Sequence, residues 1–174
     1  MRSRPSSSGC CPPSRTPTLP EALFELPDAA STTRLGAAVA SRLEPGEAVL
    51  LYGPLGMGKS TLARGLIRAL TRPDEDVPSP TFTLVQFYES EPPVAHFDLY
   101  RLTRPEEAAE IGLDEALDDG CAVIEWPERL GEDAAAWLGP DRLTVTLAED
   151  GAGRRATVSG AGAWESKVKD LHVI

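Results

Sequence analysis

The sequence is poor in basic residues, and lysine is especially scarce. Its 27 acidic residues outnumber its 17 lysines and arginines, which gives a formal net charge of −10 at pH 7. A broad, sequence-independent contact with nucleic acid needs clustered Lys and Arg, so we expect any work on RNA to go through a partner. The only lysines are Lys59, Lys167 and Lys169, and the first of these falls in the main motif of the chain.

Cysteine is rare, and long apolar runs are missing. Cys10 and Cys11 are adjacent, Cys121 lies in a predicted buried strand, and the three lack the spacing of metal ligands. This usage predicts a reducing compartment without a disulfide framework. No apolar run has the length of a membrane span, and none follows Arg2 and Arg4 as a secretory signal would need. We therefore expect a cytoplasmic protein.

The length of the chain, 174 residues, suffices for one compact α/β domain but not for a second. Residues 1–19 are rich in Ser, Pro and Arg and have almost nothing to bury, which predicts a disordered tail. Residues 20–174 are predicted to form the single domain. We do not expect an AAA-type motor, because the chain lacks the length for its second, helical domain.

An uninterrupted phosphate-loop motif stands in the first half of the chain. Residues 53–60 have the sequence GPLGMGKS and fit the pattern G-x-x-x-x-G-K-[ST]. Glycines let a backbone wrap closely around phosphate oxygens with its N–H groups pointing inward. In this motif Lys59 serves the β- and γ-phosphates, and the Ser60 hydroxyl can bind Mg²⁺.

The flanking residues favour this interpretation over a simple glycine-rich turn. Ala48 to Tyr52 predicts a buried strand that runs into the loop, and apolar residues after the loop recur at helical spacing. A helix that starts at the loop points its N-terminus, with free N–H groups, at the phosphates. The segment therefore predicts binding of a nucleoside triphosphate.

Predicted strands and helices alternate over the first two-thirds of the chain, which is typical of a largely parallel sheet. We predict an α/β protein with a three-layer P-loop NTPase fold: a mainly parallel central sheet, helices on both faces and a C-terminal β-hairpin. Besides the strand and helix at the loop, the predicted elements are a helix over 32–43 capped by Ser31, strands over 83–88, 94–98 and 121–124, a short helix opened by a capping box at 103–106 and ending near Gly112, and a hairpin of 143–147 with 155–159.

Two acids, Asp98 and Glu125, close predicted strands and each follows apolar residues. In a nucleotide-binding α/β sheet, ligand chemistry gathers at the carboxyl ends of the strands. Either acid is therefore a candidate to reach Mg²⁺ or its water shell. An acid at such a place can also be a helix cap or a solvated turn residue, and the pattern does not say which acid does which task.

Three neighbouring features each allow two interpretations. His96 points the same way as Asp98 in a regular strand, yet a buried, hydrogen-bonded histidine is the simpler interpretation. Trp126 either stacks near the site or packs in the core. Residues 78–81, with the sequence PSPT, form either a switch segment that senses the γ-phosphate or a rigid turn.

Taken together, these motifs resemble those of the TsaE (YjeE) family, the small ATPase of bacterial tRNA threonylcarbamoyladenosine synthesis. The resemblance runs from about Leu26 to Leu130, and nothing after Gly139 contributes to it. The matching segments occur in the same order along the chain, with x for positions that do not contribute: T-x-x-L-G at 32–36, L-G-x-G-K-S-T-L-x-R-G at 55–65, SPTFTLV at 79–85, HFDLYR at 96–101, PEE at 105–107 with IG at 111–112, and IEWPE at 124–128.

The resemblance implies ATP and Mg²⁺ as cofactors and assigns roles by position. It implies a phosphate cradle over Gly56, Met57, Gly58, Lys59, Ser60 and Thr61. It also implies Mg²⁺ ligands at Ser60 and Glu125, a Walker B-like acid at Asp98, a position near the nucleotide at Thr32 and a switch segment at 79–81, where Thr81 reports the γ-phosphate. Lys59, Asp98 and Glu125 are the implied catalytic residues. The implied partners are TsaD and TsaB, with tRNA reached only through that complex.

The sequence departs from the family pattern at Pro54, where the family usually has an acid, and at Met57, where it usually has a small residue.

Two further functions compete with a partner-driven ATPase. One is a small-molecule kinase, although little arginine-rich lid follows Glu125. The other is a nucleotide-dependent binding module that does not hydrolyse ATP. Either Arg101 or Arg129, or a partner, would supply an arginine finger, so we expect slow turnover by the isolated chain. The preference for adenine rests on the resemblance, since no N-K-x-D motif is present.

Overall fold

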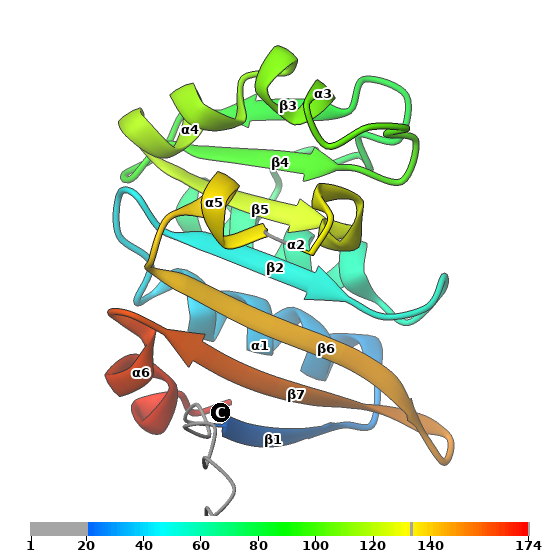
Figure 1. The fold of residues 1–174 in the computed structure, drawn as a ribbon. Helices are drawn as coiled ribbons and strands as arrows, with labels where there is room; N and C mark the ends of the chain where they lie inside the picture. Colours follow the sequence, from blue (N-terminus) through cyan, green and yellow to red (C-terminus); the bar gives the residue numbers. More distant parts are fainter. Residues whose placement is uncertain (1–20, 133, 174) are drawn as a thin grey trace, which may run out of the picture.

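The computed structural model describes residues 21–132 and 134–173 (Figure 1). The predicted tail of residues 1–19 lies outside the described residues. No helix in the described part of the chain combines the length and apolar character that a membrane crossing requires. The elements in chain order, with η marking 3-10 helices, are β1 Glu21–Leu26, α1 Ala29–Ala40, β2 Ala48–Tyr52, α2 Lys59–Leu70, β3 Val85–Tyr88, β4 Val94–Asp98, α3 Glu107–Glu110, α4 Leu113–Asp119, β5 Cys121–Glu125, η1 Pro127–Leu130, α5 Ala134–Leu138, β6 Arg142–Asp150, β7 Gly153–Ala161, α6 Trp164–Lys167 and η2 Val168–Asp170.

The strands form one seven-stranded sheet in the order β1-β7-β6-β2-β5-β4-β3. Its centre is parallel, because β2 pairs with both β5 and β6, and β5 pairs with β4. Antiparallel strands close both edges: β3 on β4 at one side, and β7 with β1 at the other. The predicted hairpin is confirmed as β6–β7, and through β6 it is part of the main sheet.

Helices cover both faces of the sheet, as predicted. Figure 1 shows α1 and α2 behind the sheet and α3, α4 and α5 in front of it. Alternation along β2 serves both layers, since Val49 and Leu51 join the cluster with α1 and α2 while Leu50 joins the cluster with α4 and α5. This three-layer arrangement leaves the carboxyl ends of the parallel strands free to hold a site.

Several boundaries differ from the predictions. The first helix begins three residues earlier than expected, and its cap is Asp28, whose side chain accepts from Ser31 N, so the prediction of Ser31 as the cap was wrong. The predicted capping box at 103–106 was wrong: α3 begins only at Glu107, and its N-cap Glu106 makes no side-chain cap hydrogen bond. The backbone N–H and the hydroxyl of Thr103 instead donate to the carboxylate of Glu107. Helix α4 and strand β1 were not predicted, because both are short and β1 forms only against β7.

Helices α1 and α2 approach each other closely at two glycines. A Cβ atom at Gly36 would overlap the backbone of Leu62 and Leu66 on α2, and one at Gly65 would overlap the backbone of Thr33 on α1. This approach places Thr32 beside the loop, where its Cγ2 lies 3.6 Å from the position that a Cβ at Gly58 would take.

Replacing Gly36 with alanine is expected to lower the free energy of unfolding by about 1–3 kcal/mol, because backbone atoms cannot move aside as a flexible side chain does. This loss exceeds the roughly 0.5–1 kcal/mol that alanine otherwise gains over glycine in a helix. Urea denaturation measures the change. Thr33→Ala on an exposed position of the same helix is the control and should stay within about 0.5 kcal/mol. Unchanged or increased stability of Gly36→Ala contradicts the close contact.

Candidate functional site

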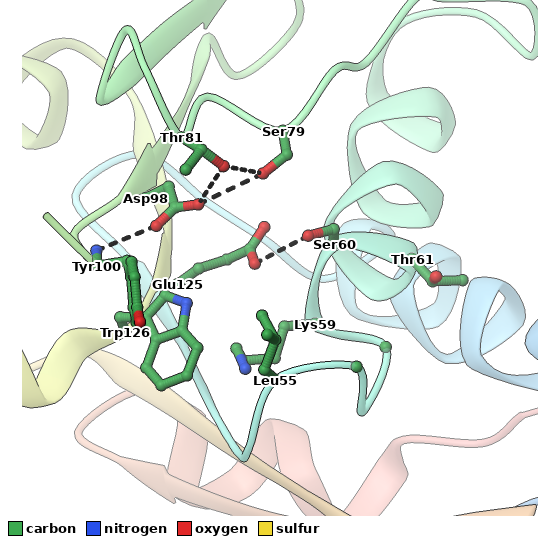
Figure 2. A pocket seen from close by; sticks show the side chains of 12 residues that line it. Leu55, Lys59, Ser60, Thr61, Ser79, Thr81, Asp98, Tyr100, Glu125 and Trp126 are labelled. Carbon is green, nitrogen blue, oxygen red and sulfur yellow. Dashed lines mark hydrogen bonds between the residues drawn. The ribbon is translucent and has the colours of Figure 1, made fainter.

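A pocket of about 370 Å³ opens at the carboxyl ends of β2, β4 and β5. The glycine-rich loop, residues 53–58, leaves β2 on one side of it, and α2 begins directly after the loop at Lys59. Figure 2 shows the strand-end acids Asp98 and Glu125 between this loop and the segment of Ser79 and Thr81. The pocket is lined by residues from these segments: Leu55, Gly56, Gly58, Lys59, Ser60, Thr61, Ser79, Thr81, Asp98, Tyr100, Glu125 and Trp126.

The loop has the backbone geometry of an anion cradle. Gly56 and Gly58 have φ of 82° and 99°, a left-handed conformation that side chains rarely adopt. Gly58 is the N-cap of α2, and no side chain bonds the first free N–H groups of this twelve-residue helix. These groups, with the positive end of the helix dipole, therefore favour a bound anion.

Lys59 is held inside the loop, with only 4% of its surface exposed. Its ammonium donates to the carbonyl oxygens of Gly53 and Pro54 and lies 3.9 Å from the ring centre of Trp126. Burial lowers the pKa of Lys59, and the carboxylates of Glu125, Glu128 and Asp98 oppose that shift. A buried cation with so few acceptors is well placed to receive an anionic group.

Asp98 and Glu125 stand side by side, because they are register partners in the parallel pair β4–β5. Glu125 faces α2 and the sheet interior: its Oε2 accepts from Ser60 at 3.0 Å and its Oε1 bonds His96 Nε2 at 2.8 Å. The two acids are almost fully buried, and the predicted gathering of strand-end acids at one edge is confirmed.

Asp98 is tied to the PSPT segment rather than to the loop. Its Oδ2 accepts from Thr81 at 3.1 Å and from Ser79 at 3.3 Å, and its Oδ1 accepts from the backbone N–H of Tyr100 at 3.0 Å. The two hydroxyls also lie 3.0 Å from each other. Any displacement of residues 79–81 would thus be felt directly by the Asp98 carboxylate.

The oxygens of Ser60 and Glu125 suit a small hard cation. Mg²⁺ takes oxygen ligands, and at nucleotide sites it uses one or two protein groups while phosphates and water complete its shell. Within residues 21–132 and 134–173, no group of three or more His, Cys, Asp or Glu is arranged to hold a metal ion. Ser60 and Glu125 offer fewer oxygens than a complete Mg²⁺ shell, so this donor pair fits a cation whose other ligands are phosphate and water.

Thr32 and Met57 lie apart from this pocket, in a second hollow of about 240 Å³ on the other side of the loop. The two hollows share Gly56, Gly58 and Thr61, so they meet at the loop. The second hollow is also lined by residues of the end of β1, the turn after it, the start of α1 and the β6–β7 hairpin: Leu26, Pro27, Asp28, Ala29, Ala152, Gly153 and Arg154.

The contacts of His96 and Trp126 decide between the two interpretations that the sequence allows for each residue. His96 is buried and hydrogen-bonded, as the simpler interpretation held, and its partner is Glu125. Trp126 has a left-handed φ of 59° and its ring lies 4.9 Å from that of Tyr100, at the pocket wall. It also packs against the cluster around β5, so the two interpretations of Trp126 both hold in part.

Sequence reasoning missed several lining residues. Tyr100 has no predicted role beyond its place in the HFDLYR motif, although it lines the pocket beside Trp126. Arg154 lies in the segment after Gly139, where the alternating pattern indicates only a strand. No local signal places Arg154 at the loop, because its position depends on the strand order of the whole sheet.

The fold and this loop define a P-loop NTPase-type α/β protein. The family model for "Threonylcarbamoyl adenosine biosynthesis protein TsaE" matches residues 26–157. The chain therefore belongs to the TsaE family, whose place is in tRNA threonylcarbamoyladenosine biosynthesis.

Individual relatives support this membership. The TsaE protein of Nostoc sp. is 36% identical over 140 residues, which cover 77% of this chain and 83% of the relative. The TsaE protein of Synechocystis sp. is 44% identical over 62% of this chain and 71% of its own length. The match to the Rickettsia felis protein, 42% identical over 98 residues, spans only 57% of that relative. The crystal structure of Bacillus subtilis YdiB shares the fold, with a TM-score of 0.71 at 24% identity over 89% of this chain and 95% of that one.

Proposed function

We propose that this chain is the Mg²⁺-dependent subunit that binds and hydrolyses ATP in the threonylcarbamoylation of tRNA, acting on a complex of TsaD and TsaB in the cytoplasm. The observation that carries the proposal is the 3.0 Å hydrogen bond between Ser60 of the loop and Glu125 at the end of β5. It joins the two oxygen groups expected to serve one Mg²⁺ ion. Membership of the TsaE family supports the biosynthetic context.

The two hollows that meet at the loop suggest how ATP lies. The phosphates would occupy the first pocket, where the free N–H groups of α2 and the ammonium of Lys59 favour negative charge. The nucleoside would pass over Gly56 and Gly58 into the second hollow, beside Thr32 and Met57. The family resemblance supports adenine there.

Hydrolysis would use the groups already gathered at the strand ends. Bound Mg²⁺ would neutralise charge on the phosphates, held by Ser60 and Glu125. Lys59 would leave the carbonyls of Gly53 and Pro54 for phosphate oxygens. Asp98 is fixed by three hydrogen bonds. It would either orient the attacking water itself or change the orientation of that water when Thr81 moves.

The arginines near the pocket mouth are held on aromatic rings. Arg101 lies 4.5 Å from the ring centre of Phe82, and Arg129 lies 5.6 Å from that of Tyr100. Neither is among the residues that line the pocket. Slow turnover by the isolated chain follows, with a TsaD–TsaB partner needed to supply or reposition the stabilising charge.

The alternative is a small-molecule kinase, and the fate of the γ-phosphate separates the two. Between Glu125 and β6 the described residues hold only the short helices η1 and α5, which gives little lid. When ATP is labelled on its γ-phosphate, an ATPase releases all of the label as inorganic phosphate. Appearance of the label in a small organic product, when cell metabolites are added, contradicts the proposal and supports the kinase.

Nucleotide binding should change the fluorescence of Trp126. The Lys59 ammonium lies 3.9 Å from the centre of the Trp126 ring, and this contact is lost when Lys59 turns toward phosphate. Titration with a non-hydrolysable ATP analogue and Mg²⁺ should therefore alter the emission of the wild-type chain. The change should largely disappear in Trp126→Phe and persist in Trp137→Phe. A signal that is equal in the wild type and in Trp126→Phe contradicts this movement of Lys59.

A further inference from the structure

His96 is a buried polar side chain to which the proposed hydrolysis gives no task. It lies on β4 with 1% of its surface exposed. Its register partner on β5 is Val123, two residues before Glu125, and Val123 belongs to the cluster beneath α1 and α2. The ring therefore stands under the carboxylate of Glu125, on the same face of the sheet.

The two carboxylate oxygens of Glu125 have different partners from different elements. Oε1 bonds His96 Nε2 at 2.8 Å, and Oε2 accepts from the Ser60 hydroxyl at 3.0 Å. A carboxylate that binds a cation is ionised and only accepts hydrogen bonds, so in that state His96 Nε2 is the donor. Because the ring holds Oε1 from below, Oε2 is the oxygen that faces the phosphate loop.

The second ring nitrogen, Nδ1, offers no other polar contact that would explain a histidine at this position. His96 Nδ1 is buried and has no hydrogen-bond partner among the described residues. Burial of a polar ring costs free energy unless its groups are bonded, and an aliphatic side chain would fill the same space without that cost. The bond to Glu125 is the only hydrogen bond that the described residues provide for the ring.

We propose that His96 is a positioning residue for Glu125. The ring fixes the side-chain rotamer that presents Oε2 to the Ser60 side, and so it preorganises the carboxylate for the cation of a Mg–nucleotide complex. Groups that hold a metal-binding carboxylate from behind commonly change metal affinity by about 10- to 100-fold when removed. The inference rests on the proposed function, because it takes Glu125 to face Mg²⁺.

Three substitutions in the full chain separate position from polarity. His96→Gln keeps an N–H donor at the place of Nε2, His96→Asn moves the donor to the place of Nδ1, and His96→Leu removes it. Calorimetry measures the dissociation constant of a non-hydrolysable ATP analogue in Mg²⁺ and again in EDTA. The ratio of the two constants is the Mg²⁺-dependent gain in affinity. Thermal unfolding shows which variants are folded, and His96→Gln against His96→Asn is the matched pair.

The expected result is a fall of about tenfold or more in the Mg²⁺-dependent gain for His96→Asn and His96→Leu. His96→Gln should largely restore it, and affinity in EDTA should match the wild type in all three. In a Glu125→Ala background, His96→Asn should cause no further loss, because the carboxylate that it positions is gone.

Two results would contradict the positioning role of His96 and leave the proposed function of the chain untouched. One is an unchanged Mg²⁺-dependent gain in folded His96→Asn and His96→Leu. The other is a loss that is equal in EDTA and Mg²⁺, or equal in the Glu125→Ala background, which would make the ring merely structural. A wild-type chain that binds the analogue without any gain from Mg²⁺ is a different failure: it contradicts the proposed function, and the role of His96 falls with it.

Discussion

Replacing Lys59 with alanine is expected to reduce ATP hydrolysis by about 10²- to 10³-fold or more. Removal of a single group that stabilises transition-state charge in a preorganised site has an effect of this size. Lys59 is the one lysine at the pocket, its burial is nearly complete, and its present acceptors are backbone carbonyls that release it without loss of a buried ion pair. ATP affinity should fall as well, because the ammonium serves the β- and γ-phosphates.

Initial rates of phosphate release in the presence of the partner proteins measure the effect of Lys59→Ala. The matched control is Lys169→Ala, which removes the same charge from an exposed position far along the chain. The control should hydrolyse ATP as the wild type does. Equal activity of Lys59→Ala and the wild type contradicts the assignment of the loop as the phosphate site.

Replacing Glu125 with glutamine is expected to reduce hydrolysis by about 10²- to 10³-fold while ATP binding in EDTA survives. The substitution keeps the shape of the side chain and one acceptor oxygen, but removes the charge that faces Ser60. Under the proposed function the change acts through Mg²⁺ and the transition state, so it should lower kcat far more than it weakens binding of the free nucleotide.

Glu132→Gln is the control for Glu125→Gln, since Glu132 is an exposed acid seven residues further along the chain. It should leave hydrolysis near the wild-type rate. The pair also separates an ATPase from a nucleotide-dependent binding module. If Glu125→Gln stops hydrolysis yet still supports tRNA modification by TsaD and TsaB at the full rate, hydrolysis is not the function and the binding module is correct.

The parts of the fold that could be predicted are those set by local pattern. The strand into the loop, the helix after it and the acid-ending strands 94–98 and 121–125 follow from apolar runs, turn residues and helical spacing. Alternation of strands and helices also indicated a parallel centre. The antiparallel edges were harder, because a partner strand far away in sequence decides whether a short segment such as β1 forms at all.

The candidate site divides in the same way. The loop and both strand-end acids are visible in the sequence, because their chemistry requires particular residue types at a fixed place in the fold. That Glu125 bonds Ser60 while Asp98 bonds Thr81 is not visible, since it depends on side-chain directions and on the register of β4 with β5. Arg154 reaches the second hollow only through the long β6–β7 hairpin, and no local motif marks such a residue.

The most direct test of a partner-driven ATPase is ATP hydrolysis by the purified chain, alone and with TsaD, TsaB and tRNA from the same organism. We predict slow hydrolysis by the chain alone, clear stimulation when all components are mixed, and loss of that stimulation in Lys59→Ala. Equal rates with and without the partners, or rapid hydrolysis by the isolated chain, would contradict a function in which the partner complex completes this site.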